Sequence, residues 1–294
     1  MTADDVVVLT WYGVEEPHHE LSNLVSARIA HALMQGSTAR VRVLAGEGEA
    51  IDLSAIPEAA IVFPVAIGRA NSGWLQRQLE RAGLSYVGSG SRACEAAIDA
   101  RVLRAWLMQA GLSVAPYLNC ERRDYPWTTA PLAESSFPQG WPVTAGPEEG
   151  PAASAALVPE QKRSGGRTFS LASLRDADRV ASLPVVEVLQ SVNASEPATL
   201  YSPWDTGYVC PAAIDDRLRF ALDRIAVAAH NALGCVMSRV QVHLDGDDAL
   251  TVSVFEAAPL LLPTSLFARA AAGVGLHFAD LARRLVDDAR QHRT

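Results

Sequence analysis

The chain has 294 residues, of which 49% are hydrophobic and 20% are charged, so it is long enough to bury a sizeable core. Its formal net charge of −8 and the absence of Lys/Arg clusters exclude nucleic acid or an anionic membrane as the main partner. The acidic start of the chain and its short apolar runs predict neither a secretory signal nor a membrane span. We therefore expect a cytoplasmic protein whose four scattered cysteines stay reduced: Cys94, Cys120, Cys210 and Cys235.

The first half of the chain alternates strand and helix patterns. Strands are expected at 5–10, 39–44, 59–67 and 84–87, and helices at 21–33 and 73–82. Such alternation predicts a parallel sheet with helices on its faces. The sequence Gly88–Ser91 is expected to be a turn that leads into a helix rather than a phosphate loop, because it lacks a GxxxxGK spacing. A helix at 95–110 and a strand at 112–118 follow.

The second half begins with a stretch of weak pattern. Residues 119–166 are rich in Pro, Gly, Ser and Ala and are expected to form long loops. Asp215 or Asp216 is expected to cap a helix that ends at Gly234. Strands are expected at 168–174 and 181–189, a hairpin at 239–244 and 249–255, and helices at 265–272 and 277–292.

Four stretches of the chain together resemble the D-alanine–D-alanine ligase family: residues 86–117, 208–235, 239–259 and 265–289. The resemblance implies an α/β, ATP-grasp-like fold with three parts. These are a Rossmann-like N-terminal domain at 1–93, a shortened central lid domain at 94–180 and a C-terminal α+β ATP-grasp domain at 181–294. It also implies ligation through an acyl phosphate, for which ATP and two Mg²⁺ ions are needed.

The nucleotide-binding positions implied by the resemblance are lost or doubtful in this chain. Ala100 and Gly146 stand where the family has two phosphate-binding lysines. Gln161 and Lys162, the only lysine of the chain, match the family's adenine-binding region loosely, and Thr168 replaces its ribose-binding carboxylate. A pocket without these cations would hold a triphosphate poorly.

The metal-binding positions implied by the resemblance are also depleted. Glu256 is retained, whereas Gln241 and Ala258 replace the family's other ligands. We expect Gln241 to lie nearly opposite Glu256 across the hairpin. One carboxylate with a neutral amide would bind Mg²⁺ weakly, so no metal is expected.

The substrate-binding positions of the family are partly retained. Glu20, Ser22, Arg239, Ser265 and Leu266 remain as candidates, with Arg239 at the family's oxyanion-stabilising position and Ser265 at its carboxylate-binding position. The family's His-Gly and Gly-Met-Thr segments are replaced by Ile67-Gly68 and Leu260–Leu262. Arg239 could instead have a structural role, in which its guanidinium forms a cross-strand ion pair with the Glu256 carboxylate.

Three functions remain open from the sequence. The leading hypothesis is a degenerate family member, a pseudoenzyme without cofactors that acts as a homodimer through its N-terminal domain or with a protein partner. The first alternative is an active ATP- and Mg²⁺-dependent carboxylate–amine ligase, rebuilt with arginines such as Arg163 and Arg167. The second is an ATP-independent enzyme or small-molecule binder that uses the old cleft around Arg239 and Glu256.

Overall fold

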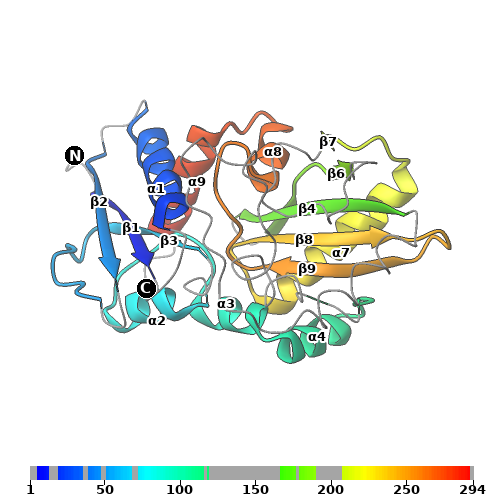
Figure 1. Ribbon diagram of the computed structural model, residues 1–294, viewed down its shortest axis with the longest axis horizontal. Helices are drawn as coiled ribbons and strands as arrows, with labels where there is room; N and C mark the ends of the chain where they lie inside the picture. Colours follow the sequence, from blue (N-terminus) through cyan, green and yellow to red (C-terminus); the bar gives the residue numbers. More distant parts are fainter. Residues whose placement is uncertain are drawn as a thin grey trace.

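A parallel sheet forms one end of the molecule, as the computed structural model shows (Figure 1). The structure describes residues 5–12, 19–35, 39–47, 51–67, 72–115, 118, 166–176, 179–189 and 207–291. The sheet has the order β2-β1-β3, with β1 at Val6–Tyr12, β2 at Val41–Glu47 and β3 at Ile61–Ala66. β1 is a continuous apolar run because both of its faces are covered.

Helices from both ends of the chain cover this sheet. Val6 and Val8 face α1 (His19–Met34) and the C-terminal helix α9 (Phe278–Gln291) in one core cluster. Val7 and Leu9 belong to a second cluster with α2 (Trp74–Arg81). Alternate residues of β1 therefore serve opposite faces, and α9 ties the end of the chain to its beginning.

A six-stranded antiparallel sheet forms the other end of the molecule (Figure 1). Its main order is β7-β6-β4-β8-β9, with β5 paired to β4. Helix α7 (Asp216–Leu233) packs against this sheet, and α8 (Leu266–Ala272) follows the last strand. The strands are β4 (Arg167–Asp176), β5 (Arg179–Ser182), β6 (Val186–Leu189), β7 (Gly207–Val209), β8 (Met237–Leu244) and β9 (Leu250–Glu256). β4 lies within residues 94–180, the range expected for the lid domain. It pairs with β8, which lies in the range expected for the C-terminal domain.

Four predicted elements differ in the structure. The helix expected at 95–110 is two helices, α3 (Ser91–Ile98) and α4 (Ala100–Gln109). Asp99 separates them because its extended backbone places the carboxylate to accept from two amides at the start of α4. The strands expected at 84–87 and 112–118 are reduced to single bridges, and the one at 181–189 is split into β5 and β6. Among the described residues, no helix has the length and hydropathy needed to cross a membrane.

The turn at Gly88–Ser91, which leads into α3, joins the two sheets. The Ser89 hydroxyl donates to the Met237 carbonyl at 2.9 Å and accepts from the backbone amides of Val236 and Met237 at 3.1 and 3.4 Å. Gly88 has φ +106°, a left-handed conformation that favours glycine. The turn therefore has a structural role, as the sequence predicted, because its hydroxyl anchors the start of β8.

Replacement of Ser89 by alanine tests this anchor. We expect Ser89→Ala to lower the free energy of unfolding by about 1–3 kcal/mol, because buried backbone groups lose their partner. Urea denaturation measures the change. The exposed Ser113→Ala is the control and is expected to change stability by less than about 0.5 kcal/mol. Equal effects of the two variants would contradict the anchoring role.

Candidate functional site

The retained arginine and the retained carboxylate of the site bind each other. Arg239 on β8 lies directly opposite Glu256 on β9, and its Nε donates to Glu256 Oε2 at 2.7 Å. The two side chains are only 4% and 6% exposed. Arg239 Nη1 also lies 3.5 Å from the Ser170 hydroxyl on β4. The two charges thus compensate each other in the interior, as the cross-strand reading predicted.

Gln241 does not lie where we expected it. The strand register pairs Gln241 with Val254, so it is a diagonal neighbour of Glu256 rather than its opposite residue. A register shift follows between Gln241 and Val242, which a turn-based count of residues misses. Ala258, after the end of β9, is half-buried. The three positions that the resemblance assigns to metal ligands therefore hold one arginine-bound carboxylate, one amide displaced from the expected register and one methyl group.

These residues do not fit a magnesium site. Mg²⁺ requires oxygen ligands in near-octahedral geometry and favours carboxylates that can face it. Glu256 instead accepts from a guanidinium at 2.7 Å. Within the described part of the chain, no group of three His, Cys, Asp or Glu side chains could hold a metal ion. No chemical step through magnesium is supported by this donor set.

The nucleotide positions that the structure describes offer no cation for a phosphate. Ala100 is the first residue of α4 and carries only a methyl group. Thr168 is buried on β4, with its hydroxyl 3.4 Å from His243 Nδ1. Burial lowers the pKa of His243, so this imidazole favours its neutral form. Gly146, Gln161, Lys162 and Arg163 lie outside the described residues.

Arg167, proposed above as a replacement cation, is held by another carboxylate. Its Nε and Nη2 donate to the two oxygens of Glu187 at 2.7 and 2.8 Å, and Nη2 also donates to the Ala213 carbonyl at 3.0 Å. These hydrogen bonds lower the pKa of Glu187 below its ordinary value. A bidentate pair of this kind competes directly with a phosphate for the same guanidinium.

The remaining substrate-binding candidates lie on two helices, α1 and α8. Glu20 is exposed in the first turn of α1. Ser22, two residues later on the same helix, is buried. The Ser265 hydroxyl accepts from the Ala268 amide at 3.3 Å and so caps α8, whose first residue, Leu266, is half-buried. Capping accounts for the serine without any substrate.

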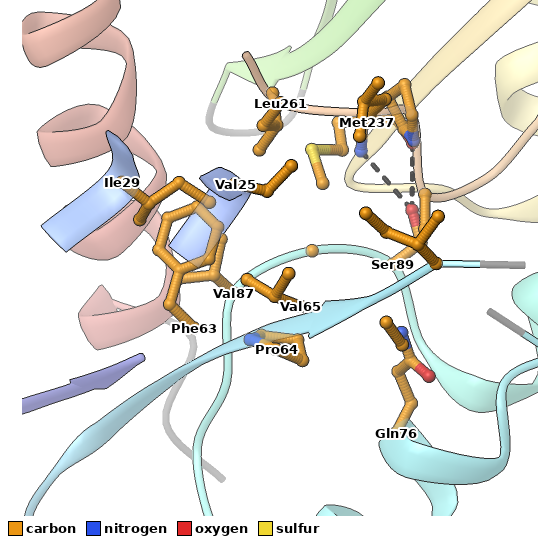
Figure 2. Close-up of a pocket in the computed structure, with 16 residues that line it drawn as sticks. Val25, Ile29, Phe63, Pro64, Val65, Gln76, Val87, Ser89, Met237 and Leu261 are labelled. Carbon is orange, nitrogen blue, oxygen red and sulfur yellow. Dashed lines mark hydrogen bonds between the residues drawn. The ribbon is translucent and has the colours of Figure 1, made fainter. Parts of the chain in front are cut away.

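The structure places the apolar replacements Ile67, Leu260 and Leu261 in the lining of one pocket between the two sheets (Figure 2). The end of β3 through Ile67 forms one wall, and the segment 258–261 after β9 forms another. Val25 of α1 and Met237 of β8 complete it. The sequence predicted the apolar exchange at Ile67 and Leu260–Leu262 but missed Gln76 of α2. Gln76 shares the buried face of α2 with Leu75 and Leu79, a placement that only the structure shows.

The arrangement of a parallel N-terminal sheet beside an antiparallel sheet is that of an ATP-grasp ligase. A solved D-alanine–D-alanine ligase of Bacillus anthracis, complexed with ATP, matches the whole chain with a TM-score of 0.72 at 16% identity and is itself covered to 99%. The VanG D-Ala:D-Ser ligase of Enterococcus faecalis matches 98% of this chain and 100% of its own with a TM-score of 0.66 at 18% identity. The fold class is therefore α/β and ATP-grasp-like.

Sequence comparison identifies the family. The model of the D-Ala–D-Ala ligase C-terminus matches residues 153–287. A D-alanine–D-alanine ligase of Frankia casuarinae is 30% identical over 86% of this chain and 72% of its own length. Another, from Anaeromyxobacter dehalogenans, is 28% identical over 98% and 97%. The chain belongs to the D-alanine–D-alanine ligase family.

Proposed function

We propose that this chain is a pseudoenzyme of the D-alanine–D-alanine ligase family, which acts in the cytoplasm by binding rather than by ATP-dependent ligation. The observation that carries the proposal is the buried ion pair between Arg239 and Glu256. Glu256 is the last carboxylate at the family's metal-ligand positions, and the guanidinium occupies one of its oxygens at 2.7 Å. Chelation of an ion would require this pair to separate inside the protein.

The energetics of phosphoryl transfer support the proposal. The reaction relies on cations across the phosphates and on metal ions, because the protein contributes little covalent chemistry. Loss of a single stabilising contact costs about 3 kcal/mol of barrier. Ala100, Gln241 and Ala258 each represent such a loss. Their combined effect would bring turnover below detection.

Titration with Mg²⁺ and ATP tests the proposal. We expect no saturable heat with millimolar nucleotide and no phosphate release with D-alanine or D-serine, because the described positions lack the required ligands. The D-alanine–D-alanine ligase of Bacillus anthracis, solved with ATP, serves as the positive control. Micromolar binding or phosphate release would overturn the proposal and support an active ligase with a rebuilt site.

A matched variant locates any binding that does occur. Gln241→Ala removes the remaining neutral ligand without breaking the buried ion pair. If the wild-type protein bound Mg–ATP at the family position, this variant would weaken the binding. Binding that the variant leaves unchanged would lie elsewhere.

The proposal includes a homodimer through the N-terminal domain, or a protein partner bound to it. Three large apolar side chains are exposed on α1 and on the edge strand β2: Leu24 at 39%, Met34 at 55% and Val43 at 52%. Exposed apolar groups of this size are common at protein interfaces. Light scattering after size exclusion, combined with pull-down, tests this part. A monomer that captures no partner would contradict it.

A further inference from the structure

The helix α4 carries apolar side chains on its outer face as well as on its inner face. Leu103 and Leu107 are buried in the core beneath the helix, whereas Val102 is 37% and Met108 is 59% exposed. Ile98, at the end of α3, is 42% exposed. Figure 1 shows α4 at the lower edge of the molecule. Because a helix that is apolar all round is normally buried, this outer face indicates a contact with another chain.

The exposed residues of α4 are arranged symmetrically about Ala105, which is itself exposed. Val102 and Met108 lie three positions before and after it, and Arg101 and Gln109 lie four positions before and after it. Positions three and four apart lie on the same side of a helix, so these five side chains form one surface. A two-fold axis through Ala105 therefore sets Val102 of one copy against Met108 of a second copy, apolar against apolar.

Arg101 is the charged residue of this surface, and its charge fits a second copy better than its own helix. It lies in the first turn of α4, where the positive end of the helix dipole disfavours a cation. The last turn of α4, at the negative end of the dipole, contains no basic residue. Antiparallel pairing about Ala105 brings each Arg101 to the C-terminal end of the other α4 and against its Gln109 amide, so both helix ends gain a favourable neighbour. The guanidinium of Arg104 is engaged elsewhere, because it donates to the Ala115 carbonyl.

We propose that α4 is an interface through which two copies of this chain bind each other, with the two helices antiparallel and related by a two-fold axis at Ala105. The small side chain of Ala105 lets the helices approach closely at the axis, and Val102 and Met108 pack on either side of it. A pair of ten-residue helices buries less than the roughly 1,200 Å² of a stable interface, so we expect a dissociation constant on the order of 100 µM. The inference goes beyond the proposed function, whose homodimer uses the N-terminal domain, and a nucleotide titration does not decide it.

Replacement of Ala105 by cysteine tests the position of the axis. Helices that touch through small residues are about 8 Å apart, which brings the two Cβ atoms near the separation of about 4 Å found in disulfides. With diamide as the oxidant, we expect Ala105→Cys to form a covalent dimer. The exposed Ser113→Cys is the matched control, because its two copies would lie on the order of 20 Å apart. The wild-type protein reports any cross-linking of the four native cysteines. Equal yields of covalent dimer from the two variants would overturn the proposal.

Light scattering over a series of protein concentrations measures the association without a cross-link. Ala105→Glu is expected to weaken it roughly tenfold or more, because two carboxylates would meet at the axis. Ala27→Glu, at an exposed position of α1 in the N-terminal domain, is the matched control and is expected to leave the α4 contact unchanged. Unchanged midpoints of urea unfolding establish that the variants are folded. A wild-type protein that stays monomeric well above the expected dissociation constant overturns the proposal, as does an Ala105→Glu variant that associates like the wild type. If Ala27→Glu alone abolishes association, the homodimer of the proposed function stands and the α4 interface does not.

Discussion

Arg239→Met and Glu256→Leu, made singly, are each expected to lower the free energy of unfolding by about 3–5 kcal/mol. Each variant leaves one charge buried without its counter-charge, at a site where both side chains are less than a tenth exposed. Urea denaturation followed by tryptophan fluorescence measures the loss. The double variant Arg239→Met/Glu256→Leu is expected to recover most of it, because apolar side chains of similar volume tolerate the interior.

A surface pair provides the matched control. Arg77 and Glu95 also form an ion pair, but their side chains are 43% and 37% exposed. The same substitutions there, Arg77→Met and Glu95→Leu, are expected to cost no more than about 1 kcal/mol each. If the single variants at Arg239 and Glu256 cost no more than these, the ion pair contributes little to the fold.

The buried ion pair gives a physical reason for the chain to keep Arg239 and Glu256 together. Loss of one partner is costly, whereas a joint apolar replacement needs two simultaneous substitutions. Gln241 and Ala258 carry no such constraint, because neither side chain is charged. Retention of Arg239 and Glu256 is thus compatible with a purely structural role, and it does not by itself argue for catalysis.

The sequence predicted those elements whose signals are local. The helix α7 is capped by Asp215, one of the two expected residues, and ends at Gly234 with φ +63°. The β8–β9 hairpin was predicted from alternation and a turn. The break at Asp99 was missed, because apolar periodicity runs through it and only the capping hydrogen bonds fix the boundary. The register of β8 against β9 likewise depends on an irregularity between Gln241 and Val242, which no single residue type in the sequence predicts.

The candidate site was predictable only where a family position could be matched. The apolar character at Ile67 and Leu260–Leu262 was predicted from substitutions, and these residues line or adjoin one pocket. The sequence left two interpretations of Arg239 open, a substrate-binding role and an ion pair with Glu256. The strand register places the two residues opposite each other and so supports the ion pair. Gln76 could not be assigned to the pocket, because its place in the lining becomes visible only once the surrounding side chains are placed.

The stability of the protein is expected to fall between about pH 6.5 and pH 4 because of one buried histidine. His230 on α7 is 2% exposed, and its Nδ1 lies 2.8 Å from the Ser238 hydroxyl on β8. Burial, together with the positive charge of Arg175, lowers the pKa of His230 to about 4. The unfolded chain takes up the proton near pH 6.5, before the folded protein does. The stabilisation is therefore complete above pH 6.5, and about 3 kcal/mol of it is lost as pH approaches 4.

Free energies of unfolding measured by urea titration at several pH values test this expectation. His230→Gln is expected to reduce the slope of stability against pH in the window from 6.5 to 4, because glutamine does not titrate. The exposed His31→Gln is the matched control and is expected to keep the wild-type slope. If His230→Gln retains the full slope, the acid sensitivity arises from other groups, and the imidazole does not resist protonation in the folded protein.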